Sequence, residues 1–294
     1  MSTKPNPSQY FKVLKIGSLF IFLVFFHSCA QLSELANVSK PSLSVVDMNI
    51  TGLTLQDIEL TADVEIDNPN NVGIDLSSYS YALDVNEKNF VAGNEQRGMT
   101  INAKNSSIVR VPVTLTFSEL LQTFQSMRDQ DESDYSFAAD FGFDLPVLGT
   151  VTVPVKYAGK IPVVKQPSIS LSNFSVENLS LSGADLIVEL SVQNPNAFQL
   201  MVDDLNFDLE VNGLRSFSGS INDEILIDRK SAQTIKLPFN ISFLNAGMAA
   251  YRLLNSDENL EYKLTGSTLI GSDLPYFKKS NFDFDKSGSV DILK

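Results

Sequence analysis

The stretch "VEIDNPNNVGIDL" spans Val64–Leu76, and "VELSVQNPNAFQL" spans Val188–Leu200. In each, an Asn-Pro-Asn tripeptide follows a run in which apolar and polar residues alternate. The two tripeptides begin at Asn68 and Asn194, which lie 126 residues apart (194 − 68). Alternation with a period of two is typical of a β-strand with one buried and one solvated face. Each stretch therefore predicts a strand that ends at the tripeptide and a second strand after it.

The offset of 126 residues holds well beyond the tripeptides. Residues 41–53 (PSLSVVDMNITGL) align without a gap with residues 167–179 (PSISLSNFSVENL), and residues 100–117 align in the same way with residues 226–243. Chance similarity rarely keeps one offset through several separated segments. The chain is therefore predicted to carry two copies of one domain.

Each of the two copies, placed at residues 41–164 and 165–294, shows about seven strand-like stretches separated by turn residues. Proline interrupts one predicted strand in each copy, at Pro112 and Pro238. This favours an edge strand or a bulge, because proline cannot donate to a strand ladder. The pattern predicts a mostly β fold class: two tandem immunoglobulin- or fibronectin-like antiparallel β-sandwiches.

One α-helix is predicted after the late strand of each copy. In the first copy it covers Ser118–Met127, with Ser118 as the N-cap. The residues expected on its apolar face are Leu120, Leu121, Phe124 and Met127. The equivalent helix of the second copy is expected at 245–254, and the acidic run 128–134 is expected to be a solvated loop.

The tripeptides have a structural explanation. Proline cannot extend a paired strand, and the residue before it is pushed toward extended backbone geometry. The second asparagine tolerates turn geometry and can bond nearby backbone amides. The residues assigned to this structural motif are Asn68, Pro69, Asn70, Asn194, Pro195 and Asn196. Lys104 and Lys230 also recur at equivalent turns, where solvated hairpin ends are expected.

The order of these features resembles the water-stress-and-hypersensitive-response (WHy) domain of the late embryogenesis abundant family, type two. The resemblance rests on Asn-Pro-Asn between two alternating runs, a late strand and a helix, found twice. It covers Pro41 to about Val164 and Pro167 to about Leu293. It implies a sandwich of two antiparallel sheets with one helix, and a role in desiccation and stress tolerance with no catalytic residues to assign.

The composition argues against several function classes. A formal net charge of −13 disfavours binding to nucleic acid phosphates or to an anionic lipid surface. The single histidine and single cysteine, His27 and Cys29, leave the rest of the chain without Ser-His-Asp, Cys-His or Cys/His metal sites. We therefore predict a protein that is not an enzyme, with no catalytic residue, cofactor or metal.

One stretch resembles a calcium-binding loop. Asp283–Lys294 ("DFDKSGSVDILK") has oxygen-bearing residues at suitable positions. However, Lys294 stands where a bidentate glutamate is required, and no convincing helix precedes the loop. A terminal strand and turn is the favoured interpretation.

The N-terminus carries the features of an export signal. Basic residues precede an 11-residue apolar run at Ile16–Phe26. That length fits a signal-peptide core of about 7 to 15 residues and is short of the roughly 20 that a membrane-spanning helix needs. Residues 1–28 are therefore predicted to be a signal peptide.

The sequence "FHSCAQ" after this run resembles the lipobox of bacterial lipoproteins. The resemblance predicts cleavage between Ser28 and Cys29, acylation of Cys29, and a tether at residues 29–40. Acyl chains would hold the protein on a membrane, and Gln31, which is not the aspartate of inner-membrane lipoproteins, favours the outer membrane. The alternative is ordinary cleavage after Ala30, which would discard the cysteine.

Three functions remain as hypotheses. The first is a membrane-anchored, non-catalytic lipoprotein that protects membranes and proteins during desiccation. The second is a lipid-binding or lipid-transfer module that holds an apolar ligand in a cavity beside the helices near Leu121 and Leu254. The third is an adhesion or scaffold protein that uses exposed strand edges.

Overall fold

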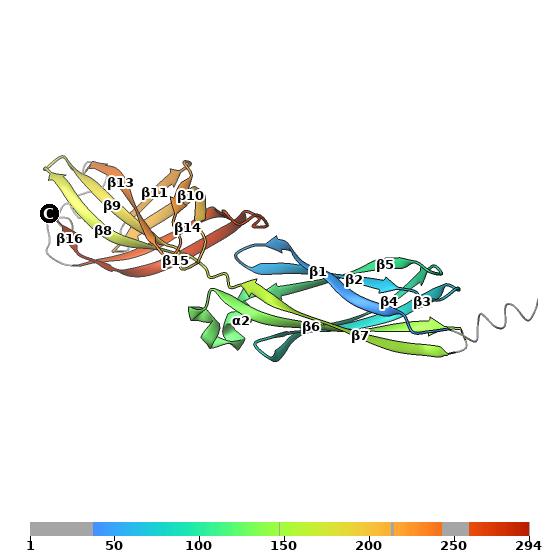
Figure 1. Cartoon of the computed structure of the whole chain (residues 1–294). Coiled ribbons are helices and arrows are strands. Elements are labelled where there is room, and N and C mark those ends of the chain that lie inside the picture. Colours follow the sequence, from blue (N-terminus) through green and yellow to red (C-terminus); the bar gives the residue numbers. More distant parts are fainter. Residues whose placement is uncertain (1–37, 147, 213–214, 243–258, 294) are drawn as a thin grey trace, which may run out of the picture. The chain divides into compact units, whose positions relative to one another are not determined.

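The computed structural model describes residues 38–146, 148–212, 215–242 and 259–293, and most of them form strands (Figure 1). The strands of the first copy are β1 (Ser42–Leu53), β2 (Asp57–Asp67), β3 (Ile74–Val85), β4 (Lys88–Ile101), β5 (Ser106–Thr116), β6 (Glu132–Leu145) and β7 (Gly149–Pro162). They form two sheets, with strand orders β1-β2-β5 and β4-β3-β6-β7.

The second copy repeats this arrangement with small changes. Its strands are β8 (Ser168–Leu179), β9 (Gly183–Gln193), β10 (Leu200–Val211), β11 (Arg215–Ile221), β12 (Ile225–Ile227), β13 (Ala232–Ser242), β14 (Leu260–Ser272), β15 (Ser280–Val290) and β16 (Ile292–Leu293). One sheet has the order β13-β9-β8-β16, and the other has the order β11-β10-β14-β15 with β12 also on β10. The predicted mostly β fold with two sandwich-like domains is confirmed.

The repeat is visible residue by residue. Strands β8, β9, β10 and β13 begin and end 126 residues after β1, β2, β3 and β5. Two turn residues with a left-handed backbone also recur: Asn86 (φ 49) with Asn212 (φ 48), and Lys104 (φ 54) with Lys230 (φ 54). The two copies therefore share turn geometry as well as strand boundaries.

The core follows the alternation in the sequence. On β2 the buried residues are Ile58, Leu60, Ala62, Val64 and Ile66, and on β9 they are Ala184, Leu186, Val188, Leu190 and Val192. The residues between them are half-buried or exposed. Each buried valine, leucine or isoleucine side chain contributes about 1.5–3 kcal/mol relative to an exposed one, so this one-sided burial fixes which face of each strand points inward.

Pro112 and Pro238, the prolines that recur in the two copies, lie on edge strands, as expected. Pro112 is in β5, the edge of its three-stranded sheet, and Pro238 is in β13, the edge of its four-stranded sheet. Pro238 pairs with Ile187 in an unbroken register, so the second copy accommodates its proline without a bulge. On an edge strand every second N–H faces away from the sheet, so a proline can stand there without the loss of a ladder hydrogen bond.

The helix of the first copy differs in detail from the prediction. α2 covers Phe117–Thr123 and is followed by the 3-10 turn η1 (Gln125–Asp129). Thr116, with no capping bond, is the N-cap, so the prediction of Ser118 was wrong. The physical reason is tertiary packing: Phe117 is buried, and its N–H donates to the carbonyl of Gln56 at 2.7 Å.

The packing of the helix face agrees with the sequence pattern in part. Leu120, Phe124 and Met127 are buried, whereas Leu121 is half-buried. The acidic run 128–134 is not wholly a loop, because β6 already begins within it. The helix expected at 245–254 lies outside the described residues.

Packing divides the chain into two compact units. One includes residues 61–112 and 134–159, and the other includes 50–60, 113–133 and the chain from residue 160 onward. The second unit therefore contains the β1–β2 turn and the segment around α2. The boundary between copies at residues 164 and 165 stays a prediction.

Candidate functional site

The first asparagine of the first tripeptide is a buried hub for loop carbonyl groups. The side-chain amide of Asn68 lies 2.9 Å from the carbonyl oxygen of Val72, 3.2 Å from that of Ile101 and 3.0 Å from that of Asn102. These carbonyls come from the β2–β3 connection and the end of β4. The two N–H groups of one buried side chain are thus shared among three backbone carbonyl groups, which the side chain holds together.

The second asparagine continues the network to the start of the copy. Asn68 Oδ1 accepts from the backbone N–H of Asn70 at 3.0 Å and from its side-chain amide at 2.9 Å. Asn70 in turn accepts from the N–H of Ser39 at 2.7 Å and donates to the Ser39 carbonyl at 2.9 Å. The tripeptide therefore fixes the chain where it enters β1.

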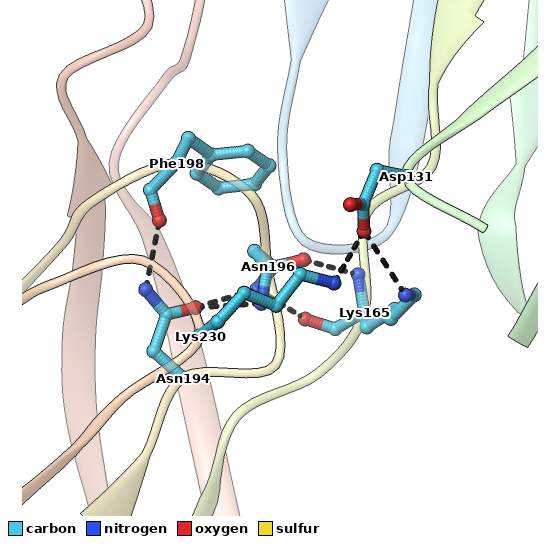
Figure 2. Close-up of polar contacts among 6 residues, drawn as sticks. All are labelled: Asp131, Lys165, Asn194, Asn196, Phe198 and Lys230. Atoms are coloured by element: carbon cyan, nitrogen blue, oxygen red, sulfur yellow. Dashed lines mark hydrogen bonds and ion pairs between the residues drawn. The ribbon is translucent and has the colours of Figure 1, made fainter. Parts of the chain in front are cut away.

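The second copy builds the same hub. The side-chain amide of Asn194 lies 2.8 Å from the carbonyl oxygen of Phe198, 3.2 Å from that of Ile227 and 3.1 Å from that of Asp228. Figure 2 shows the bond from Asn194 to Phe198. The two sets of distances agree within 0.1 Å, so the hub is a property of the repeated domain.

The link to the start of the copy also recurs. Asn196 donates its N–H to Asn194 Oδ1 at 2.9 Å. Its side chain accepts from the N–H of Lys165 at 2.7 Å and donates to the Lys165 carbonyl at 2.8 Å (Figure 2). Lys165 thus takes the backbone role that Ser39 has in the first copy.

The two recurring turn lysines share a backbone role and differ in their side chains. Each donates its N–H to the carbonyl of the second asparagine of its tripeptide at 3.0 Å. Lys104 Nζ then donates to the carbonyl of Pro69 at 2.6 Å, whereas Lys230 Nζ donates to the carboxylate of Asp131. Both residues are exposed at turns, where the sequence places them.

Asp131, Lys165 and Lys230 form a charged cluster in the second compact unit, which Figure 2 shows beside the Asn194 hub. Lys165 Nζ lies 3.5 Å from Asp131 Oδ1, and its side chain is only 12% exposed. The backbone carbonyl of Asp131 also accepts from the N–H of Val163 at 2.9 Å. Asp131 therefore holds the segment 163–165 through both its backbone and its side chain.

The cluster changes the acidity of its members. The hydrogen bond from Lys230, together with the charges of both lysines, lowers the pKa of Asp131 below its ordinary value. Burial, together with the nearby charge of Lys230, lowers the pKa of Lys165 despite the attraction of Asp131. The contacts with the lysines thus favour the charged form of Asp131. For Lys165, the attraction of Asp131 offsets only part of the cost of burying the charge.

The chemistry of this cluster is that of a structural ion pair. It joins one carboxylate to two ammonium groups. Among the residues that the structure describes, no group of three or more His, Cys, Asp or Glu side chains is placed to hold a metal ion. Asp283–Asp291 of the calcium-like stretch lies mainly in strand β15.

A groove of about 340 Å³ lies beside α2 in the second compact unit. Its apolar lining comes from Leu55, Phe117, Leu121 and Val164. Leu121 was expected beside such a cavity; Leu254 lies outside the described residues.

The predicted export and lipidation residues, Ser28 and Cys29, also lie outside the described residues. Within the described part of the chain, no helix has the length and apolar character needed to cross a bilayer.

A family model for late embryogenesis abundant proteins matches residues 63–159 and 189–288, more than half of the chain. The two matches begin 126 residues apart (189 − 63), which is the offset of the two hubs. The chain belongs to the late embryogenesis abundant protein family. Both copies of this late embryogenesis abundant protein carry the family's domain.

Similar curated proteins match about one copy of the repeat. A desiccation-related protein of Arabidopsis thaliana is 27% identical over 136 residues, which is 46% of this chain and 80% of that protein. A desiccation protectant protein of Glycine max is 27% identical over 137 residues, which is 47% of this chain and 88% of that protein.

A similar solved structure also covers about one copy of the repeat. The solution structure of a late embryogenesis abundant protein shares 25% sequence identity, covers 51% of this chain and 87% of its own, and has a TM-score of 0.36. The two curated relatives of this late embryogenesis abundant protein given above are desiccation-related by name, which supports a role in water stress.

Proposed function

We propose that this protein is a non-catalytic, membrane-anchored protector of membranes and proteins during water loss, and that both copies are WHy-type domains. The observation that supports it most is the double match to a family whose curated relatives are desiccation-related proteins. The formal net charge of −13 adds a physical mechanism. Like-charged, hydrated surfaces repel one another and oppose aggregation.

Survival of drying tests this function directly. A strain that lacks the gene should survive drying and osmotic shock less well than its parent, and the intact chain supplied in trans should restore survival. A purified drying-sensitive enzyme should also keep more activity when dried with the protein than with an equal mass of serum albumin. Unchanged survival together with no protection in the tube would contradict the proposal.

We further propose that Cys29 carries the membrane anchor and that the outer membrane is its site. The support is the lipobox-like sequence before it and the residue that follows Ala30. Mass spectrometry of the mature N-terminus should show an acylated Cys29. An unmodified N-terminus at Gln31 would instead demonstrate ordinary signal cleavage, and fractionation of the envelope tests the membrane assignment.

The groove beside α2 favours lipid binding as a second candidate function. Its volume of about 340 Å³ is near the lower end of the range for small-molecule sites, roughly 300–1,000 Å³. It therefore suits a single acyl chain better than a two-chain lipid. Purified protein should release a single-chain lipid on solvent extraction, and Leu121→Asp should abolish this while Gln125→Asp, an exposed change nearby, should not. Equal extraction from both variants, or none from the native protein, would argue against this function.

A further inference from the structure

The β1–β2 turn of the first copy is docked on a segment of extended chain. Leu53 donates its N–H to the carbonyl of Tyr276 at 3.1 Å, and Lys278 donates its N–H to the carbonyl of Leu53 at 2.7 Å. Leu53 and Phe277 thus form a parallel bridge. All of these residues belong to the second compact unit. The 276–278 segment therefore pairs with the free edge of β1 at Leu53, the last residue of that strand.

Docking buries the leucine and adds one charged contact. Leu53 is 2% exposed. Lys278 Nζ lies 3.0 Å from Glu59 Oε2. This ion pair passes over Gly52, where an added Cβ would lie 2.7 Å from Lys278 Nζ. A glycine at this position therefore leaves the lysine the space that it needs.

In the equivalent turn of the second copy, between β8 and β9, two apolar side chains are exposed to solvent. Leu179 and Leu181 stand 126 residues after Leu53 and Leu55, and they are 37% and 79% exposed. Strand β16 pairs with β8 at Phe174 and Ser175. In the part of the chain that the structure describes, no bridge extends that edge of β8 as far as Leu179.

The exposed turn also lacks the charged contact. Asn178 stands where the first copy has Gly52, and its side-chain amide donates to Asp185 Oδ2 at 3.0 Å. Asp185 is the counterpart of Glu59, so its carboxylate is already engaged. A partner for this turn would bind through apolar contact and backbone bonds, without the lysine pair.

The repeat itself indicates the partner. The segment that covers Leu53 lies in the β14–β15 connection, and its counterpart is the β6–β7 connection. That connection carries Leu148, which stands 126 residues before Leu274 and is 51% exposed. We propose that the β8–β9 turn of one chain, through Leu179 and Leu181, docks on Leu148 and the start of β7 in a second copy of the chain.

This contact is heterologous, because it joins two different surfaces of the same molecule. Repetition of a heterologous contact gives rings or open filaments. Strong like charge opposes the contact in dilute solution. Because association joins separate chains, mass action increases it as the protein concentration rises, and loss of water raises that concentration. This self-association is separate from the protective function proposed above.

Photo-crosslinking of the purified intact chain at high protein concentration tests the contact. The change Leu181→benzoylphenylalanine places a crosslinker on the turn, and a mixture of light and heavy-isotope chains distinguishes links between chains from links within one. We expect dimers between chains whose linked peptide contains Leu148. Leu226→benzoylphenylalanine, at another leucine that is half exposed, should give a much lower yield of dimers.

Leucine variants complete the test. With the crosslinker at 181, Leu148→Ser should reduce the yield of dimers by about tenfold, because a buried leucine contributes that much to an apolar contact. Leu226→Ser should leave the yield unchanged, and circular dichroism should show the same strand content in both. Links confined to one chain, links between two turns, or an unchanged yield in Leu148→Ser would each overturn the proposal.

Discussion

Lys165 and Asn196 are joined twice, by a hydrogen bond from the Lys165 N–H at 2.7 Å and by one to the Lys165 carbonyl at 2.8 Å. Neither bond uses the lysine side chain, which is directed to Asp131 instead. One residue therefore connects the tripeptide hub of the second copy with the charged cluster. Its backbone and its side chain can be tested separately.

The first prediction concerns the hub asparagines. Asn68→Ala or Asn194→Ala should lower the free energy of unfolding by roughly 2–5 kcal/mol, because buried loop carbonyls lose their donor. Asn68→Asp should be at least as harmful, since a carboxylate would face three carbonyl oxygens. Denaturant unfolding of the full chain measures both.

Asn89→Ala is the matched control for the hub variants. Asn89 is exposed, and its side-chain amide donates to the carboxylate of Asp84 at 3.2 Å. Its loss should change stability by less than about 0.5 kcal/mol. Equal effects of the control and the hub variants would show that the hub is not structural.

The second prediction concerns Asp131 and pH. Because contact with the lysines lowers its pKa below the ordinary 3.8, ionised Asp131 stabilises the fold above that pH, and the contribution is lost as pH falls through the folded-state pKa. The wild type should therefore be more stable than Asp131→Asn at pH 7, and the difference should vanish in acid. Thermal unfolding across this range checks it, with Asp129→Asn as the control; a constant difference would contradict the assignment.

The third prediction concerns the Lys165 side chain. Its folded-state pKa lies below the ordinary 10.5, so the charged form costs stability at neutral pH, and this cost disappears as pH rises toward 10.5. Lys165→Met should be more stable than the wild type at pH 7, by at most about 1 kcal/mol, and the gap should close in base. Lys160→Met, at an exposed ion pair, is the matched control.

The fourth prediction uses two strand glycines. An added Cβ at Gly183 would lie 2.3 Å from the backbone oxygen of Ile241, so β13 would have to move. Gly183→Ala should therefore cost about 1–3 kcal/mol of stability. An added Cβ at Gly98 would have no heavy atom within 4 Å outside the glycine and its two chain neighbours. Gly98→Ala should therefore be neutral or slightly stabilising. A similar cost for both variants would contradict this packing.

Local patterns in the sequence were sufficient to predict the strands and the repeat. The alternation on β2 and β9 reports directly which side chains are buried, and one constant offset relates the two copies. Pro112 and Pro238 pointed to edge strands for a reason that depends only on the missing N–H. These features need no knowledge of distant contacts.

The start of the helix and the charged cluster could not be predicted from local patterns, because they depend on contacts between residues far apart in the sequence. Ser118 has the chemistry of an N-cap, but the bond from Phe117 to Gln56 starts the helix earlier. Asp131 lies in a run of acidic residues that looks solvated, and only the fold brings Lys165 and Lys230 to it. Extending the repeat alignment to residues 39 and 165 would have shown that a lysine replaces a serine there, but not what it contacts.

Hydrogen exchange of the full chain carrying Asn194→Ala tests the central claim most directly, which is that each tripeptide holds its own copy of the domain together. We predict faster exchange in β9, β10 and β13, with unchanged protection in β3 and β4. Unchanged protection throughout, or an equal loss in both copies, would contradict the account.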